Sequence, residues 1–240
     1  LGHAERMPDY WEFFSASPGP SGFIQPIETL EPEKTTQLDF GVQYQGDQLE
    51  AWASAYVGQV RDFILFSYGP GMMPGHIRST ASNVDARIMG GELGAAYRLS
   101  TQWKTDASLA YAWGKNRSDD DALPQMPPLE ARLGLNWQSG AWSAGSLLRL
   151  VASQHRYAVN EGNIVGQDLG RTGGFGIASL HGGYAWSKAV KLSVGIDNLF
   201  DKTYAEAISR GGADISGYEK TTRVNEPGRT AWLKVQVALD

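Results

Sequence analysis

The stretch Trp103-Lys104-Thr105-Asp106-Ala107-Ser108-Leu109-Ala110-Tyr111-Ala112-Trp113 decides the fold, because two kinds of residue alternate along it. Its odd-numbered positions include Trp103, Leu109, Tyr111 and Trp113, whereas the even-numbered positions are charged or small. Period-two alternation of this length predicts a β-strand with one apolar and one polar face. The segment is also long enough for a tilted strand to cross a bilayer.

The same alternation recurs along the chain. It is seen in the segments 37–44, 90–99, 129–137 and 231–239. The polar faces carry charged and small residues, and the apolar faces carry aromatic residues toward their ends. Strands that face lipid on one side and a wet interior on the other produce this pattern. A soluble sheet also alternates, so strand length and the aromatic ends are what favour a membrane barrel.

Short and long connections alternate between the expected strands. Short turns are expected at 46–47, 100–101, 139–140 and 187–188, and long loops at 8–34, 69–80, 118–128, 160–173 and 201–228. Outer-membrane barrels have short periplasmic turns and long external loops. The sequence therefore predicts an all-β fold, an antiparallel transmembrane β-barrel, with about ten strands in this chain.

Composition excludes several other classes. No apolar run reaches the roughly 20 residues of a transmembrane helix. The net charge is −5 without a basic patch, which argues against a nucleic-acid partner. Cysteine is absent, so there is neither a disulfide framework nor a thiolate metal site. Hydrolase motifs such as Gly-x-Ser-x-Gly and His-Glu-x-x-His are missing, so the sequence predicts a transporter and no enzyme.

Three stretches resemble the TonB-dependent receptors of the bacterial outer membrane. They are Gly2-His3-Ala4-Glu5-Arg6-Met7-Pro8-Asp9-Tyr10-Trp11-Glu12, Val194-Gly195-Ile196-Asp197-Asn198-Leu199-Phe200-Asp201-Lys202-Thr203-Tyr204, and Glu226-Pro227-Gly228-Arg229-Thr230. The second resembles the end of the family's penultimate strand. Independently of the family, Asn198 and Asp201 can bond their own backbone where a strand leaves a sheet. We expect this motif to be a structural strand end rather than a catalytic site.

The resemblance implies a larger protein than this chain. Barrels of this family have about 22 strands and a plugged lumen. Residues 1–240 would be the carboxy-terminal portion of such a barrel, with the plug domain absent and both ends of the chain trimmed. The implied partners are the TonB complex, through the missing amino-terminal part, and outer-membrane lipid and lipopolysaccharide.

The end of the chain, in the segments 208–213, 217–219 and 221–229, is similar to the copper receptors of this family. Met72, Met73 and His76 lie together in one Gly- and Pro-rich loop. Thioether sulfur suits Cu(I), and imidazole suits copper in either oxidation state. We therefore expect these residues to contact a copper ion or metal chelate that is cargo, with no resident cofactor. Alternatively, the two methionines pack within the loop.

Other polar and sulfur-bearing residues are weaker candidates. Met126 lies in another Pro-rich loop, and His155 and His181 are expected on strands. The acidic segment 118–121 gathers cations or is a solvated loop tip. Several charged residues are expected to face the lumen, where they contact the plug or hydrate the interior: Glu92, Arg98, Asp106, Glu130 and Arg132.

Three alternatives remain at this point. The first is a siderophore-iron receptor of the same family, whose aromatic and basic pocket would use Arg6, Tyr10, Trp11, Phe13 and Phe14. The second is a complete ten-stranded outer-membrane protease, although no Asp–His pair is evident. The third is a soluble all-β binding domain.

Overall fold

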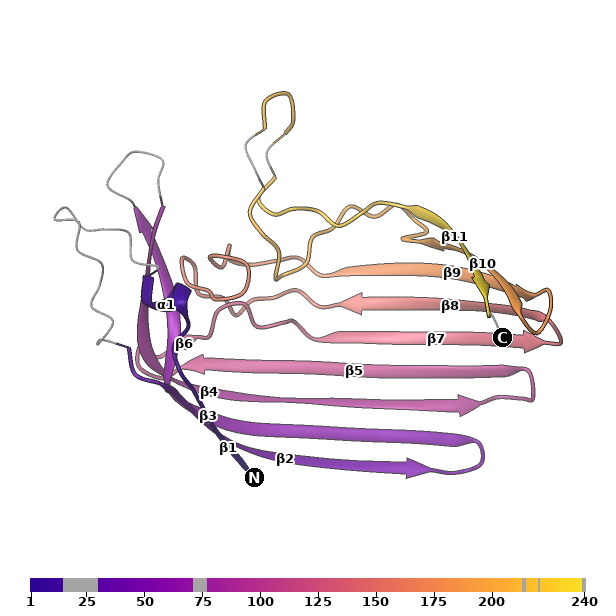
Figure 1. Cartoon of the computed structure of the whole chain (residues 1–240), viewed down its shortest axis with the longest axis horizontal. Coiled ribbons are helices and arrows are strands. Elements are labelled where there is room, and N and C mark those ends of the chain that lie inside the picture. Colours follow the sequence, from indigo (N-terminus) through magenta and orange to yellow (C-terminus); the bar gives the residue numbers. More distant parts are fainter. Residues whose placement is uncertain (15–29, 71–76, 213–214, 220, 239–240) are drawn as a thin grey trace.

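The computed structural model describes residues 1–14, 30–70, 77–212, 215–219 and 221–238. One antiparallel sheet dominates it (Figure 1). The elements are β1 (Gly2–Arg6), α1 (Tyr10–Phe14), β2 (Glu33–Gln45), β3 (Leu49–Pro70), β4 (Ile77–Arg98), β5 (Trp103–Asn116), β6 (Asp121–Ala122), β7 (Glu130–Ser139), β8 (Trp142–Val151), β9 (Phe175–Ala185), β10 (Val190–Asp197) and β11 (Thr230–Val237). The expected strand around Trp103–Trp113 is confirmed as β5.

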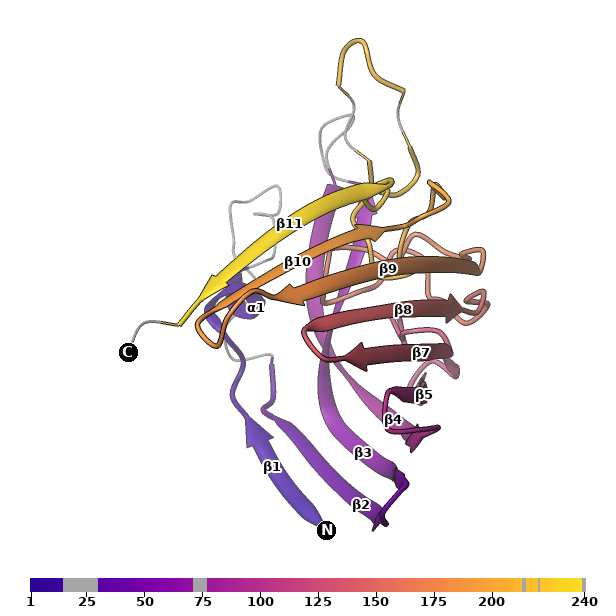
Figure 2. The same ribbon diagram turned by 90° about the vertical axis from the view of Figure 1, so that its right-hand side faces the viewer.

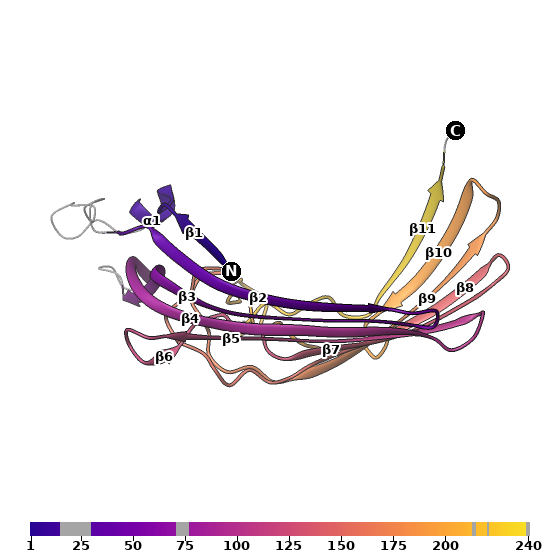
Figure 3. The same ribbon diagram turned by 90° about the horizontal axis from the view of Figure 1, so that it is seen from below.

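The main path of the sheet runs β1-β2-β3-β4-β5-β7-β8-β9-β10-β11, and the short β6 pairs with β5 outside this path. This confirms the expected number of strands. Among the described residues β1 pairs only with β2 and β11 only with β10, so the sheet is open. Figure 2 shows the strands from β1 to β11 arranged in an arc, and Figure 3 shows the curvature of the sheet from below. A complete ten-stranded barrel, and with it the protease alternative, is wrong.

Strand register assigns each side chain to one of two faces, since directly paired residues of neighbouring strands point the same way. Asp106 is opposite Gly134, and Arg132 is opposite both Ser108 and Arg149. We call the face that bears Asp106, Glu130 and Arg132 the inner face. Helix α1, which inner-face residues hold, lies within the arc in Figure 2, so the inner face is the concave one. The expected assignment of charged residues to one face is confirmed.

The outer face is apolar and uncovered. Phe40 is 70% exposed, Leu133 46% and Leu233 69%, and all three belong to the outer rows. No second sheet or helix layer covers these rows in the described part of the chain (Figure 1). Soluble proteins rarely expose so continuous an apolar surface. The soluble alternative is therefore wrong, and a lipid-facing wall explains the exposure.

Aromatic residues ring the outer face at the short-turn end. Trp103 lies 6.4 Å from Trp137, and Trp142 lies 4.5 Å from Tyr184, between ring centroids. Such belts sit at membrane interfaces, because an indole or phenol ring is apolar with one polar group. Trp103 and Trp113 are ten residues apart, which is roughly 33 Å along a strand. A tilt of about 40° reduces this to roughly 25 Å, the height of the apolar band of such barrels.

Glycine is concentrated on the inner face, where side chains converge because the sheet is concave. A Cβ atom at Gly134 would lie 2.5 Å from the Asp106 carboxylate, and one at Gly145 would lie 2.5 Å from the His181 ring. A Cβ atom at either position would force the facing side chain to move. These glycines therefore let polar side chains of the next strand lie against the wall.

The β3–β4 hairpin extends well past its neighbours, and this corrects the expected loop 69–80. Pairing continues from Val60 to Pro70, which is opposite Ile77. A bulge interrupts it between Val60 and Phe63, and Asp62 there has a φ of 57°. Beyond the bulge both faces of the hairpin are covered, so alternation gives way to the continuous apolar run 63–66. Ile64 and Leu65 are fully buried.

Helix α1 is a single turn after β1. Asp9 and Glu12 cap it reciprocally: the Glu12 backbone N–H donates to Asp9 Oδ1 at 2.9 Å, and the Asp9 N–H donates to Glu12 Oε2 at 2.7 Å. No helix among the described residues has the length and apolar character needed to cross a bilayer.

Candidate functional site

The functional surface of a barrel wall is its inner face together with the long loops at one end, since the outer face contacts lipid. The long connections 117–129, 152–174 and 198–229 meet at one end of the sheet, with the β3–β4 extension beside them (Figure 1). The short turns lie at the other end. This confirms the expected alternation of short and long connections.

Two aromatic rings lie flat against the inner wall, and the sequence pattern did not reveal them. A Cβ atom at Gly94 would lie 2.7 Å from the Trp52 ring, and one at Gly90 would lie 2.6 Å from the Tyr56 hydroxyl oxygen. The glycines therefore create the space that these rings fill. The available clue was the pair of glycines, spaced four apart, on the polar face of β4.

A hollow of about 380 Å³ adjoins these rings. Trp52, Tyr56, Glu92, Glu130 and Arg132 line it, and Pro127 and Pro128 also contribute. Arg132 Nε donates to Glu130 Oε1 at 2.6 Å, so the Glu130 charge is compensated. The Glu92 carboxylate has no such partner in the described part of the chain. Glu92 therefore contributes an uncompensated negative charge to this hollow.

Arg149 on β8 ties the long loop 198–229 to the wall. Its Nη1 atom donates to Glu206 Oε1 at 2.5 Å, and its Nη2 atom donates to Glu130 Oε2 at 2.7 Å. The guanidinium also lies over the Phe175 ring, which packs on Tyr204 at 4.4 Å between centroids. We call Arg149, Glu130, Glu206, Phe175 and Tyr204 the loop clamp.

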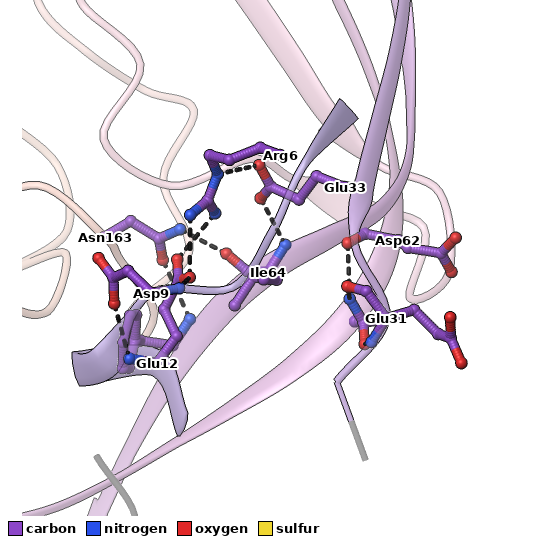
Figure 4. A network of polar contacts seen from close by, with 10 residues as sticks. Arg6, Asp9, Glu12, Glu31, Glu33, Asp62, Ile64 and Asn163 are labelled. Atoms are coloured by element: carbon purple, nitrogen blue, oxygen red, sulfur yellow. Dashed lines mark hydrogen bonds and ion pairs between the residues drawn. The ribbon is translucent and has the colours of Figure 1, made fainter. Parts of the chain in front are cut away.

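A second polar network joins the two described ends of the first long loop. Arg6 donates to Glu33 Oε2 at 2.7 Å and, through its two Nη atoms, to both oxygens of Glu12 at 2.8 and 2.9 Å (Figure 4). Glu33 Oε1 accepts the Ile64 backbone N–H at 2.7 Å, next to the bulge in β3. The family-like stretch 2–12 is therefore a structural junction. Arg6 is neutralised by two carboxylates, so it is unsuited to bind an anionic siderophore.

The loops 117–129 and 152–174 form one assembly through buried polar side chains. Gln125 Oε1 accepts the backbone N–H groups of Asn163 and Ile164 at 2.9 and 2.8 Å. Asn163 Nδ2 in turn donates to the Ile64 carbonyl at 2.5 Å, which joins these loops to the β3–β4 extension. Asp168 accepts three backbone N–H groups from the same loops. Hydrogen bonds thus join the loops 117–129 and 152–174 to each other and to the β3–β4 extension at the long-loop end of the sheet.

The expected metal ligands Met72, Met73 and His76 lie outside the described residues. The strands that flank their segment are described: Gly69 pairs with Arg78 and Pro70 with Ile77 at the end of the extension. Among the described residues, no group of three or more His, Asp or Glu side chains is placed to hold a metal ion.

The contacts of Met126 and His155, two of the weaker candidates, are with neighbouring side chains of the protein. Met126 packs against the small core of Val60, Ala86 and Leu123, so it is a packing residue. His155 lies in the loop after β8, where its Nε2 is 2.7 Å from Ser153 Oγ, so the expected strand position is wrong. The strand ends at Val151 because the chain there turns into the loop assembly. His181 is on β9 as expected, facing inward.

The acidic segment 118–121 is a loop tip held by local contacts. Asp119 accepts a hydrogen bond from Asn116 Nδ2 at 2.8 Å, and Asp120 forms an ion pair with Lys115. The Lys115 ammonium lowers the pKa of the exposed Asp120 carboxyl. These contacts favour the interpretation of a solvated tip.

The inner wall at the short-turn end is positively charged. Arg98, Lys104, Lys191 and Lys234 line a hollow of about 500 Å³ together with His181. Lys104 reaches Glu50 at 3.6 Å across the wall. The inner wall is therefore basic near the short turns. The sequence identified Arg98 as inward-facing but did not reveal the cluster.

Comparison with known proteins agrees with this architecture. Residues 1–199 match the family model described as "TonB dependent receptor-like, beta-barrel". A solved structure of the copper transporter OprC is 60% identical, with a TM-score of 0.90, over 98% of this chain and 37% of that one. The ferric enterobactin receptor of Pseudomonas aeruginosa is 26% identical over 90% of this chain and 31% of its own length. The vitamin B12 transporter BtuB of Vibrio vulnificus is 28% identical over 88% and 34%.

The chain spans about a third of the length of these relatives. All three are receptors or transporters by name, and none is an enzyme.

Proposed function

The chain belongs to the TonB-dependent receptor β-barrel family, and on this premise we propose that the whole protein imports copper across the bacterial outer membrane. The observation that carries the proposal is the 60% identity to a copper transporter along 98% of the chain. Identity to the ferric enterobactin and vitamin B12 proteins is less than half as high. This difference in identity supports copper as the cargo.

The rest of the protein completes the transport machinery in this proposal. The open edges of β1 and β11 would pair with further strands, because unpaired backbone groups are too costly in lipid. A plug domain outside residues 1–240 would fill the concave side and connect to TonB. The charged inner wall supports this arrangement, since it offers the plug the unpaired Glu92 carboxylate in its middle and a basic zone near the short turns.

We propose that Met72, Met73 and His76 contact the copper ion during its entry. Two thioethers and one imidazole form a soft donor set that suits Cu(I). Their segment joins the ends of β3 and β4, the strands that extend past the rest of the sheet at the long-loop end. Other ligands would come from parts of the protein beyond this chain.

Copper binding by the full-length receptor tests both the proposed cargo and the three proposed ligands. The purified protein is titrated with Cu(I) and Cu(II), and copper uptake is measured in cells that rely on this receptor. We expect the triple substitution of Met72→Ala, Met73→Ala and His76→Ala to weaken copper binding or uptake by tenfold or more, since it removes three ligands. The matched control replaces the exposed Met7 and His155 by alanine and is expected to change neither.

Two results would contradict these statements separately. If the triple variant binds and imports copper like the wild type, these three residues are not ligands, although the receptor could still carry copper. If the wild-type protein binds no copper and instead restores growth on a ferric siderophore, the cargo assignment is wrong. The siderophore alternative has the 26% identity to the enterobactin receptor in its favour, but Arg6 is already paired.

A further inference from the structure

A cavity of about 350 Å³ lies at the base of the loop 198–229, where it approaches the residues before β9. Its lining includes three cationic side chains, Arg171, Lys202 and Arg223. No carboxylate lines it among the described residues. Hydroxyl and amide groups complete the polar lining: Thr172, Thr203, Tyr204, Thr221, Thr222 and Asn225. The cavity therefore offers positive charge and hydrogen-bond donors together.

Arg223 is the unusual member of this set, because it is only 8% exposed. Its Nη2 atom donates to the Gly170 carbonyl at 2.6 Å and its Nη1 atom to the Arg171 carbonyl at 3.4 Å, while its buried Nε atom has no hydrogen-bond partner. A buried guanidinium normally pairs with a carboxylate. Here two carbonyl groups take that place, and one donor is left over.

The neighbouring carboxylates compensate this charge incompletely. Asp168 acts on Arg223, but its two oxygens already accept three backbone N–H groups. Burial consequently lowers the pKa of Arg223 despite Asp168. Glu206 and Glu226 act on Tyr204, whose pKa burial and these two charges raise, but Glu206 is itself paired with Arg149. Glu226 has no ion-pair partner within the described ranges, so Asp168 and Glu226 together oppose three cationic side chains, and the cavity keeps a net positive charge.

We propose that this cavity binds a phosphate group carried by a small organic molecule or by a lipid headgroup. Guanidinium and ammonium groups bind phosphate oxygens through charge-assisted hydrogen bonds. Threonine hydroxyls and an asparagine amide provide further donors of fixed geometry. The volume exceeds that of a phosphate ion and falls in the range of ligand pockets, which leaves room for the attached group. The cavity lining shares no residue with the copper ligands proposed above.

Phosphate titration of the full-length receptor in detergent tests the proposal. Binding of inorganic phosphate is followed by calorimetry and by ³¹P line broadening. We expect Arg171→Gln and Lys202→Gln each to weaken binding by about fivefold, because each removes one charge-assisted contact. These side chains are exposed, so both variants should fold. Lys188→Gln, in a short turn at the other end of the sheet, is the matched control and should bind like the wild type.

A second measurement separates the two sources of the phosphate. The receptor is mixed with vesicles that contain phosphorylated lipid A or its dephosphorylated form, with and without free glycerol phosphate. Phosphate-dependent vesicle association that Arg171→Gln and Lys202→Gln weaken supports a lipid headgroup. Binding of glycerol phosphate alone with the same variant pattern supports a soluble ligand. Binding of neither, or equal binding by all variants, overturns the proposal.

Discussion

Asn198 shows how a single side chain shapes the strand end that carries the family resemblance. Its Oδ1 atom accepts the Lys202 backbone N–H and its Nδ2 atom donates to the Lys202 carbonyl, both at 2.8 Å. Asn198 and Asp201 have φ values of 50° and 54°, in the left-handed region that asparagine and aspartate tolerate best. The expected bonds to the local backbone are confirmed for Asn198, whereas Asp201 Oδ1 accepts the backbone N–H of the distant Arg229 at 2.8 Å. The sequence pattern did not reveal that Asn198 is buried.

Glu161 introduces a pH dependence into the loop assembly. Burial raises the pKa of its carboxyl, and Asp119 and Asp121 raise it further. Because the folded-state pKa lies above the unfolded value, Glu161 stabilises the loops most below the unfolded pKa, and this contribution is lost as pH rises through the folded pKa. We expect Glu161→Gln to slow hydrogen exchange in residues 158–164 at neutral pH, relative to the wild type at the same pH.

This comparison has a clear control. Asp47→Asn, in the short turn between β2 and β3, removes a charge far from the loops and should leave their exchange unchanged. The difference between Glu161→Gln and the wild type should disappear in acid, where both side chains are neutral. Faster exchange in Glu161→Gln at neutral pH would show that the ionised carboxylate stabilises the loops.

At the scale of elements, the loop clamp should decide how firmly the loop 198–229 is held. We expect Glu206→Gln to increase the rate of trypsin cleavage at Arg210 by about tenfold, which corresponds to ~1.4 kcal/mol. The reason is that Glu206 loses its charge, and hydrogen bonds to a charged group are worth about twice those between neutral groups. Cleavage of the full-length receptor under native conditions, followed by mass spectrometry, measures the effect.

Two further variants make this test specific. Glu219→Gln removes a charge from an exposed position of the same loop and should not change the cleavage rate. Arg149→Gln combined with Glu206→Gln should be less than additive, because both changes remove one interaction. Strict additivity of the two substitutions would mean that the ion pair does not hold the loop.

The strands were more predictable than the contacts between loops. Alternation in β5 and β7 gave both the strand and its inner face, because one side meets lipid and the other meets polar groups. Alternation fails in the β3–β4 extension, since Ile64 and Leu65 are buried on both sides by loops distant in sequence. The loop clamp joins Arg149 to Glu206, and the separation of 57 residues leaves no local pattern. Arg223 entered the sequence analysis only as part of the family-like segment 221–229, and its burial was not predicted.

The two faces of the sheet have different surroundings and therefore carry different residues. The convex outer face exposes apolar rows and an aromatic belt, and the concave inner face combines glycines with charged side chains. Curvature links the two, because it spreads side chains apart on the outer face and crowds them on the inner one. The difference in polarity between the two faces makes the lipid-facing assignment testable by substitution.

Leu133, in the middle of β7 on the outer face, provides that test. Arginine at the bilayer midplane costs about 2–4 kcal/mol in outer-membrane barrels, and about 0–1 kcal/mol near the interfaces. We therefore expect Leu133→Arg in the full-length receptor to reduce strongly the fraction that folds into lipid vesicles, as measured by heat-modifiable electrophoretic mobility over a urea series. Leu99→Arg, beside the short turn after β4, should fold almost like the wild type. Equal effects of the two substitutions would mean that the outer face does not span a membrane, because only a bilayer makes the cost depend on depth.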